Sequence, residues 1–245
     1  YQQVEKPEQF YQSALSFGHF LKQLGDYPAE SLYETIPQFH DTRKRFRDFE
    51  DAQRKDVKNR ARLCRQEIDF VLSRKADCGV LMNQLEEGKL PLRVTHNDTK
   101  LNNILFDKDT DRGLCIIDLD TIMPGLAAND FGDSIRFGAS TAEEDEQNLD
   151  KVHFDINLYD IYVKGYLEMA KDVLTPEEIK SLPWGARLMT LECGMRFLAD
   201  FLQGDVYFKT AYPEHNLVRA RTQFRLVKEM EEQFDEMNEI LKKYI

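Results

Sequence analysis

Side chains of complementary chemistry lie close together in the segment His96-Asn97-Asp98-Thr99-Lys100-Leu101-Asn102-Asn103. This segment contains a carboxylate (Asp98), an ammonium group (Lys100) and an amide (Asn103), and a second carboxylate, Asp118, follows fifteen residues later. Phosphoryl transfer from a nucleotide needs such a set, because it requires a base for the attacking hydroxyl, oxygen ligands for Mg²⁺ and positive charge near the phosphates. Asp98 suits the first role, Asn103 and Asp118 the second, and Lys100 the third.

Short apolar runs predict the elements that position these groups. Residues 104–106 and 114–117 are typical of two strands, and the polar residues 107–113 between them are typical of a turn. Antiparallel pairing of these strands would place Asn103 and Asp118 at adjacent strand ends. A further short strand is expected at 92–95, leading into the loop.

The order His-x-Asp-x-x-x-x-Asn is similar to the catalytic loop of the kinase superfamily. Asp118 is followed by Leu119-Asp120 rather than Phe-Gly, and no Ala-Pro-Glu segment follows, so a typical protein kinase is not expected. The sequence resembles instead the aminoglycoside and choline kinase-like phosphotransferases, and among them most closely the N-acetylhexosamine 1-kinases. The resemblance covers most of residues 90–210 and rests on motifs at 96–100, 117–125, 130–136, 192–200 and 204–209.

The resemblance implies roles for further residues. It gives His96 a supporting role rather than that of a general base, and it makes Arg196 and Tyr207 contacts to the acceptor together with Asp98 and Asp118. Two local alternatives stay open: Arg196 could pair with Glu192 one helical turn away, and Tyr207 could serve only in packing. Asp130 and Asp133 are expected to support the site, either by bracing the loop or by capping a helix. Asp120 is expected to lie either in the site or directly behind it, in a supporting position.

The fold class that follows is mainly α (α+β): the C-terminal helical lobe of a protein-kinase-like fold with a small catalytic β-hairpin. Apolar residues at helical spacing, capping residues and breakers indicate where its helices lie. A capping box at Thr175-Pro176-Glu177-Glu178 predicts one helix start, and Pro183 is expected to interrupt that helix. Helices are expected at 8–24, in two pieces within 41–75, and at 76–88, 155–172, 185–202 and 217–242.

The glycine-rich loop and the Val-Ala-x-Lys strand of a kinase N-terminal lobe are both missing from the sequence. We therefore expect residues 1–245 to be one C-terminal lobe that holds the catalytic loop and the acceptor site, with the N-terminal nucleotide lobe absent from this chain. An isolated lobe of this kind is expected to bind ATP poorly and to turn over little.

Composition restricts the remaining possibilities. The formal net charge of −11 opposes nonspecific binding to nucleic acid, and no apolar run approaches the length of about 18–20 residues that a membrane helix needs. The four cysteines are scattered without Cys-x-x-Cys pairing, which predicts neither a zinc site nor a disulfide framework. A reducing cytoplasmic location is the simplest expectation, with no nucleic-acid or membrane partner.

Together with the resemblance, the residues predict an ATP- and Mg²⁺-dependent phosphotransferase acting on a sugar hydroxyl, most closely the anomeric hydroxyl of an N-acetylhexosamine. Another acceptor is an open alternative: choline, an aminoglycoside, homoserine or methylthioribose. A non-catalytic pseudokinase that serves as a binding module is a second alternative. A third is a glycosyltransferase that uses Asp118-Leu119-Asp120 as an Asp-x-Asp metal motif, although that motif is short.

Overall fold

The computed structural model describes residues 4–245, which form nine α-helices and four short strands. The helices are α1 (Pro7–Gln23), α2 (Thr42–Lys55), α3 (Arg65–Leu72), α4 (Val80–Glu86), α5 (Ala127–Gly138), α6 (Ile156–Ala170), α7 (Pro176–Gln203), α8 (His215–Glu232) and α9 (Phe234–Lys242). The strands are β1 (Arg93–Thr95), β2 (Ile104–Phe106), β3 (Gly113–Ile116) and β4 (Met123–Gly125). The predicted mainly helical fold class with a small catalytic hairpin is confirmed.

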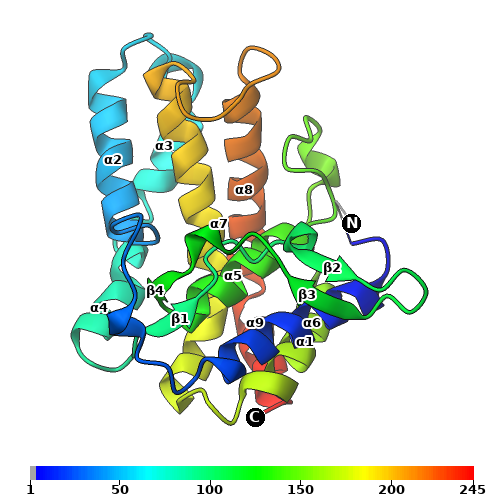
Figure 1. The fold of residues 1–245 in the computed structure, drawn as a ribbon. Helices are drawn as coiled ribbons and strands as arrows, with labels where there is room; N and C mark the ends of the chain where they lie inside the picture. The colour runs from blue at the N-terminus through cyan, green and yellow to red at the C-terminus, as the bar shows by residue number, and fades with distance from the viewer. Residues whose placement is uncertain (1–3) are drawn as a thin grey trace.

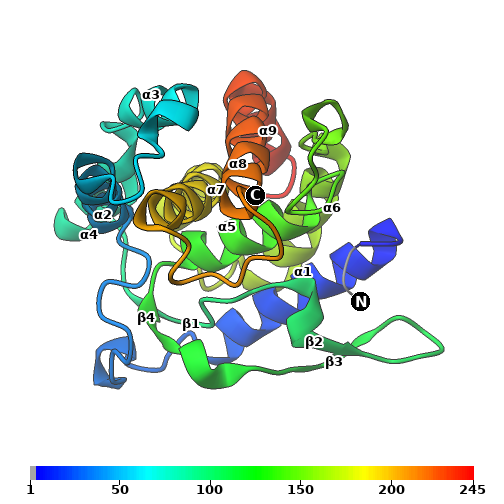
Figure 2. The ribbon, with the colours of Figure 1, turned by 90° about the horizontal axis from the view of Figure 1, so that it is seen from above.

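Helix α7 is the centre of the molecule, with α2, α5 and α8 packed around it (Figures 1 and 2). A second layer forms where α1 packs against α6. The core between these layers is aromatic: Phe131 of α5 meets Tyr159, Tyr162 and Tyr166 of α6 at ring-centroid distances of 6.0, 5.5 and 5.3 Å. Edge-to-face packing of this kind anchors α5, the helix that follows the hairpins, to the bundle.

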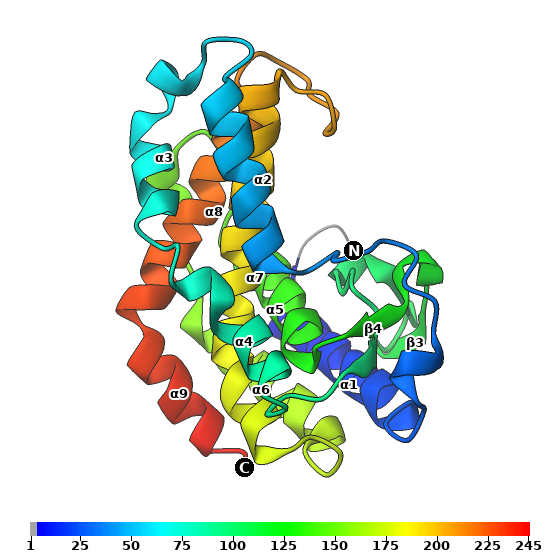
Figure 3. The same ribbon diagram turned by 90° about the vertical axis from the view of Figure 1, so that its left-hand side faces the viewer.

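The β2–β3 hairpin and the β1–β4 strand pair lie beside α1 on one side of the helical bundle, as Figure 3 shows. Strands β2 and β3 pair antiparallel with Ile104 opposite Ile116, as the sequence predicts. The sequence analysis did not identify a partner for strand β1. In the structure β1 pairs with β4, and Thr95 lies opposite Met123. This second pair ties the chain after Asp118 to the chain before the catalytic loop.

The predicted interruption at Pro183 is wrong, because α7 continues through this residue for 28 residues in all. The helix begins at the predicted capping box, in which the side chains of Thr175 and Glu178 bind each other's backbone N–H. Proline inside a helix removes one hydrogen bond and costs about 3 kcal/mol. Burial outweighs this cost here, since Leu182 and Ala186 on either side of Pro183 are fully buried.

The single helix expected at 217–242 is also wrong in its extent. The chain leaves helical geometry at Gln233 (φ −103°, ψ 12°), which separates α8 from α9. The change of direction allows the apolar face of α9, which includes Met237, Ile240 and Leu241, to become buried against the core beside α6. No helix within residues 4–245 combines the length and apolarity needed to cross a membrane.

Candidate active site

The loop between β1 and β2 brings three of the predicted residues into direct contact. The Nδ2 atom of Asn103 donates to the backbone oxygen of Asp98 at 2.8 Å and to its Oδ2 at 2.9 Å. The Nζ atom of Lys100 lies 2.7 Å from Oδ1 of Asp98. A carboxylate, an ammonium group and an amide therefore meet at one point, with Asp98 at its centre.

The protonation of Lys100 is set by opposing effects. Burial lowers the pKa of Lys100, but the charges of Asp133 and Asp98 and the hydrogen bond to Asp98 outweigh it and raise the pKa above its ordinary value. Lys100 is therefore a cation at neutral pH, as contact with a phosphate requires.

Asp118 follows the end of β3 directly across the hairpin from this cluster. The backbone N–H of Ile117 donates to the carbonyl of Asn103 at 2.9 Å, so Asp118 is the next residue beyond that pair. Asp118 is exposed, has left-handed backbone geometry (φ 61°, ψ 61°), and accepts no hydrogen bond from any residue in 4–245. The hairpin thus places Asn103 and Asp118 at neighbouring positions, with the Asp118 carboxylate free.

The segment that contains Asp118 is fastened to the loop at both ends. The Nε2 atom of His96 donates to the carbonyl of Ile117 at 3.0 Å, and the ring is buried beside the edges of Phe17 and Phe20. At the other end Thr121 donates from Oγ1 to the carbonyl of His96 at 2.7 Å. His96 thus braces the backbone on both sides of Asp118, and its Nδ1 atom has no hydrogen-bond partner within residues 4–245.

Two side chains at this position could hold a metal ion. Asn103 uses its Nδ2 atom for Asp98, which leaves its Oδ1 atom as an acceptor, and the Asp118 carboxylate is exposed and unpaired among the described residues. Mg²⁺ is commonly bound by one or two protein side chains together with phosphate oxygens and water. The donor set fits that mode, and no cluster of three or more acidic, histidine or cysteine side chains within residues 4–245 offers a denser site.

Asp130 and Asp133 lie inside α5 and bind the loop backbone rather than capping a helix. The two carboxylate oxygens of Asp130 accept the N–H groups of His96 and Asn97, each at 2.8 Å. Asp133 accepts the N–H of Thr99 at 3.0 Å. In the structure both carboxylates therefore brace the loop, and neither caps a helix.

These two buried carboxylates have pKa values that move in opposite directions. Burial raises the pKa of Asp130 to about 6, although the two backbone N–H groups oppose the shift. Burial also acts on Asp133, but the charges of Arg136, Lys100 and His40 outweigh it and lower its pKa. Asp133 is therefore a stable anion next to the loop.

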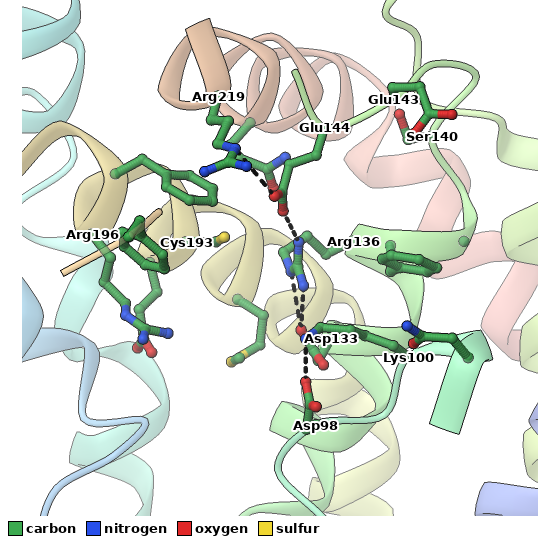
Figure 4. Close-up of a pocket in the computed structure, with 18 of the residues that line it drawn as sticks. Asp98, Lys100, Asp133, Arg136, Ser140, Glu143, Glu144, Cys193, Arg196 and Arg219 are labelled. Atoms are coloured by element: carbon green, nitrogen blue, oxygen red, sulfur yellow. Dashed lines mark hydrogen bonds and ion pairs between the residues drawn. The ribbon is translucent and has the colours of Figure 1, made fainter. Parts of the chain in front are cut away.

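A cavity of about 770 Å³ opens beside the loop and is lined by Asp98, Lys100, Arg196 and Tyr207, among others. Figure 4 shows Asp98 and Lys100 at one wall and Arg196 at another. Asn103, Asp118 and Asp120 do not line this cavity. Asp120 is exposed in the single turn Leu119–Thr121 and accepts no hydrogen bond from residues 4–245.

The ion pair considered between Arg196 and Glu192 is not formed, because Glu192 binds His40 and Thr42 instead. The guanidinium carbon of Arg196 lies 5.7, 5.8 and 5.5 Å from the ring centroids of Phe39, Tyr207 and Phe208. Within residues 4–245, Arg196 has no ion pair and no hydrogen bond. The faces of these aromatic rings therefore stabilise the positive charge of Arg196. Its N–H donors remain available at the cavity.

Tyr207 lies on a loop that Asp200 holds in place. The buried Asp200 carboxylate accepts the backbone N–H groups of Val206, Tyr207 and Phe208 at 2.9, 2.8 and 3.0 Å. The side chain of Tyr207 is 72% exposed, so the packing alternative does not describe it. The sequence analysis missed these contacts of Asp200, although the three N–H groups lie only six to eight residues after it.

Two further sets of residues were missed by the sequence analysis. A row of ion pairs runs from Asp133 through Arg136 and Glu144 to Arg219 along the cavity (Figure 4). Arg136 stands in the motif at 130–136, but nothing local indicates its partners. His40 lies in the cavity wall, hydrogen-bonded to Glu192 and to the catalytic loop, and no sequence signal singles it out.

Comparison with solved structures places this architecture among small-molecule kinases in fold. A choline kinase from Cryptosporidium parvum matches with a TM-score of 0.54 at 14% identity, over 96% of this chain and 70% of that one. A Plasmodium vivax ethanolamine kinase matches with a TM-score of 0.50 at 14% identity, over 90% of this chain and 60% of that one. At such low identity the likeness concerns the fold alone.

A comparison with family models gives a match to the sequence itself. The model described as "Phosphotransferase enzyme family" (APH) matches residues 3–167, which include the catalytic loop, the β2–β3 hairpin and the aspartates of α5. The match spans more than half of the 245 residues. The chain therefore belongs to the phosphotransferase enzyme family.

Proposed function

We propose that this chain carries the catalytic and acceptor-binding side chains of an ATP- and Mg²⁺-dependent kinase that phosphorylates the anomeric hydroxyl of an N-acetylhexosamine. The observation that carries the proposal is the shared cavity: Asp98 and Lys100 line it together with Arg196 and Tyr207. A hydroxyl-bearing acceptor in that cavity would lie between a base and a set of polar and aromatic contacts.

In the proposed reaction the Asp98 carboxylate accepts a hydrogen bond from the attacking hydroxyl and takes its proton. An anomeric hydroxyl is more acidic than an ordinary alcohol, which eases the removal of its proton by a carboxylate. Lys100 offsets charge on the phosphoryl group, and Asn103 and Asp118 hold Mg²⁺. The metal, when bound, neutralises charge on the phosphate oxygens and orients them.

The charge of Arg196 favours a neutral polar acceptor over a cationic one such as choline. Among the carboxylates that line the cavity, Asp133, Glu144 and Glu192 each lie against a basic side chain, whereas Glu143 and Asp155 have no ion pair within residues 4–245. Arg196 has no carboxylate partner within residues 4–245, so its N–H donors suit a neutral oxygen such as the carbonyl of an N-acetyl group. A quaternary ammonium ion would meet the positive charge of Arg196 there, which has no ion pair within residues 4–245.

The test is an ADP-release assay of the full-length protein with MgATP, against N-acetylglucosamine, N-acetylgalactosamine, their 1-deoxy analogues, choline and an aminoglycoside. We expect turnover with the N-acetylhexosamines and none with the 1-deoxy sugars, which lack the attacking hydroxyl. Faster turnover with choline or the aminoglycoside would overturn the sugar assignment while leaving the kinase assignment in place.

A second test replaces Asp98, the proposed base. Asp98→Asn keeps the size and the hydrogen bond to Asn103 but cannot take a proton, so kcat should fall by about 10²- to 10⁴-fold. KM for ATP should change little, because Asp98 touches the acceptor rather than the nucleotide. Wild-type turnover by Asp98→Asn would contradict the assignment of the base.

A further inference from the structure

His40 connects a distant helix to the catalytic loop through a buried ring. Its Nδ1 atom lies 2.9 Å from Oε1 of Glu192 on α7, and its Nε2 atom lies 3.3 Å from the carbonyl oxygen of Asn97, the residue before Asp98. The side chains of His40 and Glu192 are only 8% and 1% exposed. The ring therefore bridges two groups in a setting from which water is largely excluded.

The chemistry of both neighbours fixes the protonation of the ring. The Oε2 atom of Glu192 accepts the Thr42 hydroxyl at 2.9 Å while its Oε1 atom faces His40, so both of its oxygens act as acceptors, as they do in an ionised carboxylate. An ionised carboxylate can only accept, and so can the carbonyl of Asn97. Both ring nitrogens of His40 must therefore donate, and only the imidazolium form carries a proton on each.

We propose that His40 is a positioning residue that acts as a doubly protonated imidazolium and holds the Asn97–Asp98 peptide beneath the reactive carboxylate. Asn97 needs such support because its backbone is left-handed (φ 64°), a conformation that costs a non-glycine residue about 1 kcal/mol or more. Asp130 accepts the N–H of Asn97 at 2.8 Å from one side, and His40 donates to its carbonyl from the other.

The charges around His40 support the cationic form. Glu192 on α7 and Asp133 and Asp130 on α5 face it, while Arg196 on α7 and Arg45 on α2 act on Glu192. Burial lowers the pKa of His40, but Glu192 and Asp133 outweigh burial and raise it above its ordinary value.

The chain contains a matched control for this arrangement in His153. Its Nδ1 atom lies 3.0 Å from Oε1 of Glu229 and its Nε2 atom 2.9 Å from the carbonyl of Asp150, which repeats the local chemistry of His40. The His153 side chain is 49% exposed and does not line the cavity. His153→Gln therefore removes a similar pair without touching the catalytic loop.

The first experiment needs no turnover. The chain is labelled uniformly with ¹⁵N, the His40 ring is assigned with His40→Gln, and its shifts are measured at about pH 7.5, above the ordinary histidine pKa. Two protonated ring nitrogens are expected, together with shifted backbone resonances of Asp98 in His40→Gln but not in His153→Gln. A ring with one unprotonated nitrogen, or an Asp98 resonance unchanged in His40→Gln, would overturn the proposal.

The second experiment measures turnover and rests on the proposed function. In the full-length protein, His40→Gln should lower kcat by about 10- to 100-fold through misplacement of Asp98, with KM for ATP within about twofold. Glu192→Gln should move the alkaline limb of the kcat profile to lower pH, which a merely structural role of His40 would not do. His153→Gln should match the wild type in both measurements.

The two experiments separate failure of this proposal from failure of the proposed function. A wild type without sugar-dependent ADP release contradicts the proposed function, while the ring and Asp98 resonances still decide the state and contact of His40. Wild-type kcat and pH profile in both His40→Gln and Glu192→Gln would overturn the positioning role even if the imidazolium is found.

Discussion

At the scale of single residues, the candidate site depends on groups that hold other groups in place. Asp98 contacts Lys100 and Asn103 directly, whereas His96, Asp130 and His40 act on the backbone around it. A reactive group that is misplaced by about 1 Å can lose about two orders of magnitude in rate. We therefore expect the bracing residues to matter for turnover through the position that they give to Asp98.

The metal assignment predicts a difference between two neighbouring aspartates. Asp118→Asn should raise the Mg²⁺ concentration for half-maximal activity by about 10- to 100-fold, because it removes one negative oxygen ligand. Asp120→Asn is the matched control, since Asp120 is likewise exposed but lies two residues further along. A titration of activity with Mg²⁺ in which Asp118→Asn matches the wild type would contradict the assignment.

The buried pair of His40 and Glu192 predicts that the free energy of unfolding is highest within a limited range of pH. The pKa of His40 is raised in the folded protein. Its contribution to the free energy of unfolding is therefore complete below the ordinary histidine pKa of 6.5 and is lost as the pH rises through the folded-state pKa. The pKa of Glu192 is lowered, so its contribution is complete above its ordinary value of 4.5 and is lost as the pH falls through the folded-state pKa.

Urea unfolding of the wild type and His40→Gln checks this window. The variant should lose more unfolding free energy at about pH 5.5 than at about pH 9, because the contribution of the charged His40 is complete at the lower value and diminishes as the pH rises through its folded-state pKa. An equal loss at both values would show that the protonation of His40 does not change between them, which contradicts the predicted window, and His153→Gln gives the baseline for an exposed pair.

At the scale of elements, the site depends on how closely α5 and α7 approach each other. Gly132 of α5 lies against the backbone of Gly185 on α7, and a Cβ atom at Gly185 would collide with the backbone of Ala128. Helix α5 carries Asp130 and Asp133, which bind the loop backbone. The close crossing of α5 and α7 therefore sets the position of those carboxylates relative to the loop.

Gly185→Ala should destabilise the chain although alanine is the better helix former. The propensity gain is about 1 kcal/mol, whereas overpacking against a rigid backbone costs about 1–3 kcal/mol or more. We expect a net loss of unfolding free energy in urea. Gly25→Ala is the control, because its Cβ would meet no atom closer than 3.3 Å, and a larger loss there would contradict the argument.

At the scale of the whole molecule, we propose that residues 1–245 form the acceptor-binding lobe of a larger phosphotransferase. The chain spans 70% and 60% of the two kinase structures that it matches. The β2–β3 hairpin and the turn after it expose Leu105, Leu114 and Leu119, each more than half exposed, next to the proposed metal ligands. These observations support a nucleotide lobe supplied from outside this chain.

The lobe proposal predicts weak nucleotide binding by the isolated chain. Calorimetric titration with MgATP should give a dissociation constant weaker than about 1 mM, which corresponds to about −4 kcal/mol, because much of the nucleotide's surface would stay in water. The proposal predicts little ADP release by the chain alone. Tight binding with steady sugar-dependent turnover would contradict it.

The sequence by itself determined the parts of this protein that rest on local contacts. The loop from His96 to Asn103, the β2–β3 hairpin and the Thr175 capping box could be predicted because their hydrogen bonds join residues close in the chain. Such contacts depend on residue type and spacing alone, and both are visible in the sequence.

Only the tertiary structure decided the parts that depend on distant partners. His40 meets Glu192 across 152 residues, and the N–H groups of His96 and Asn97 meet Asp130 across 34 and 33 residues. Pro183 remains helical, and Gln233 divides α8 from α9, because the burial gained outweighs the local preference. Contacts between distant residues leave no periodic or local signal, so only packing of the whole chain establishes them.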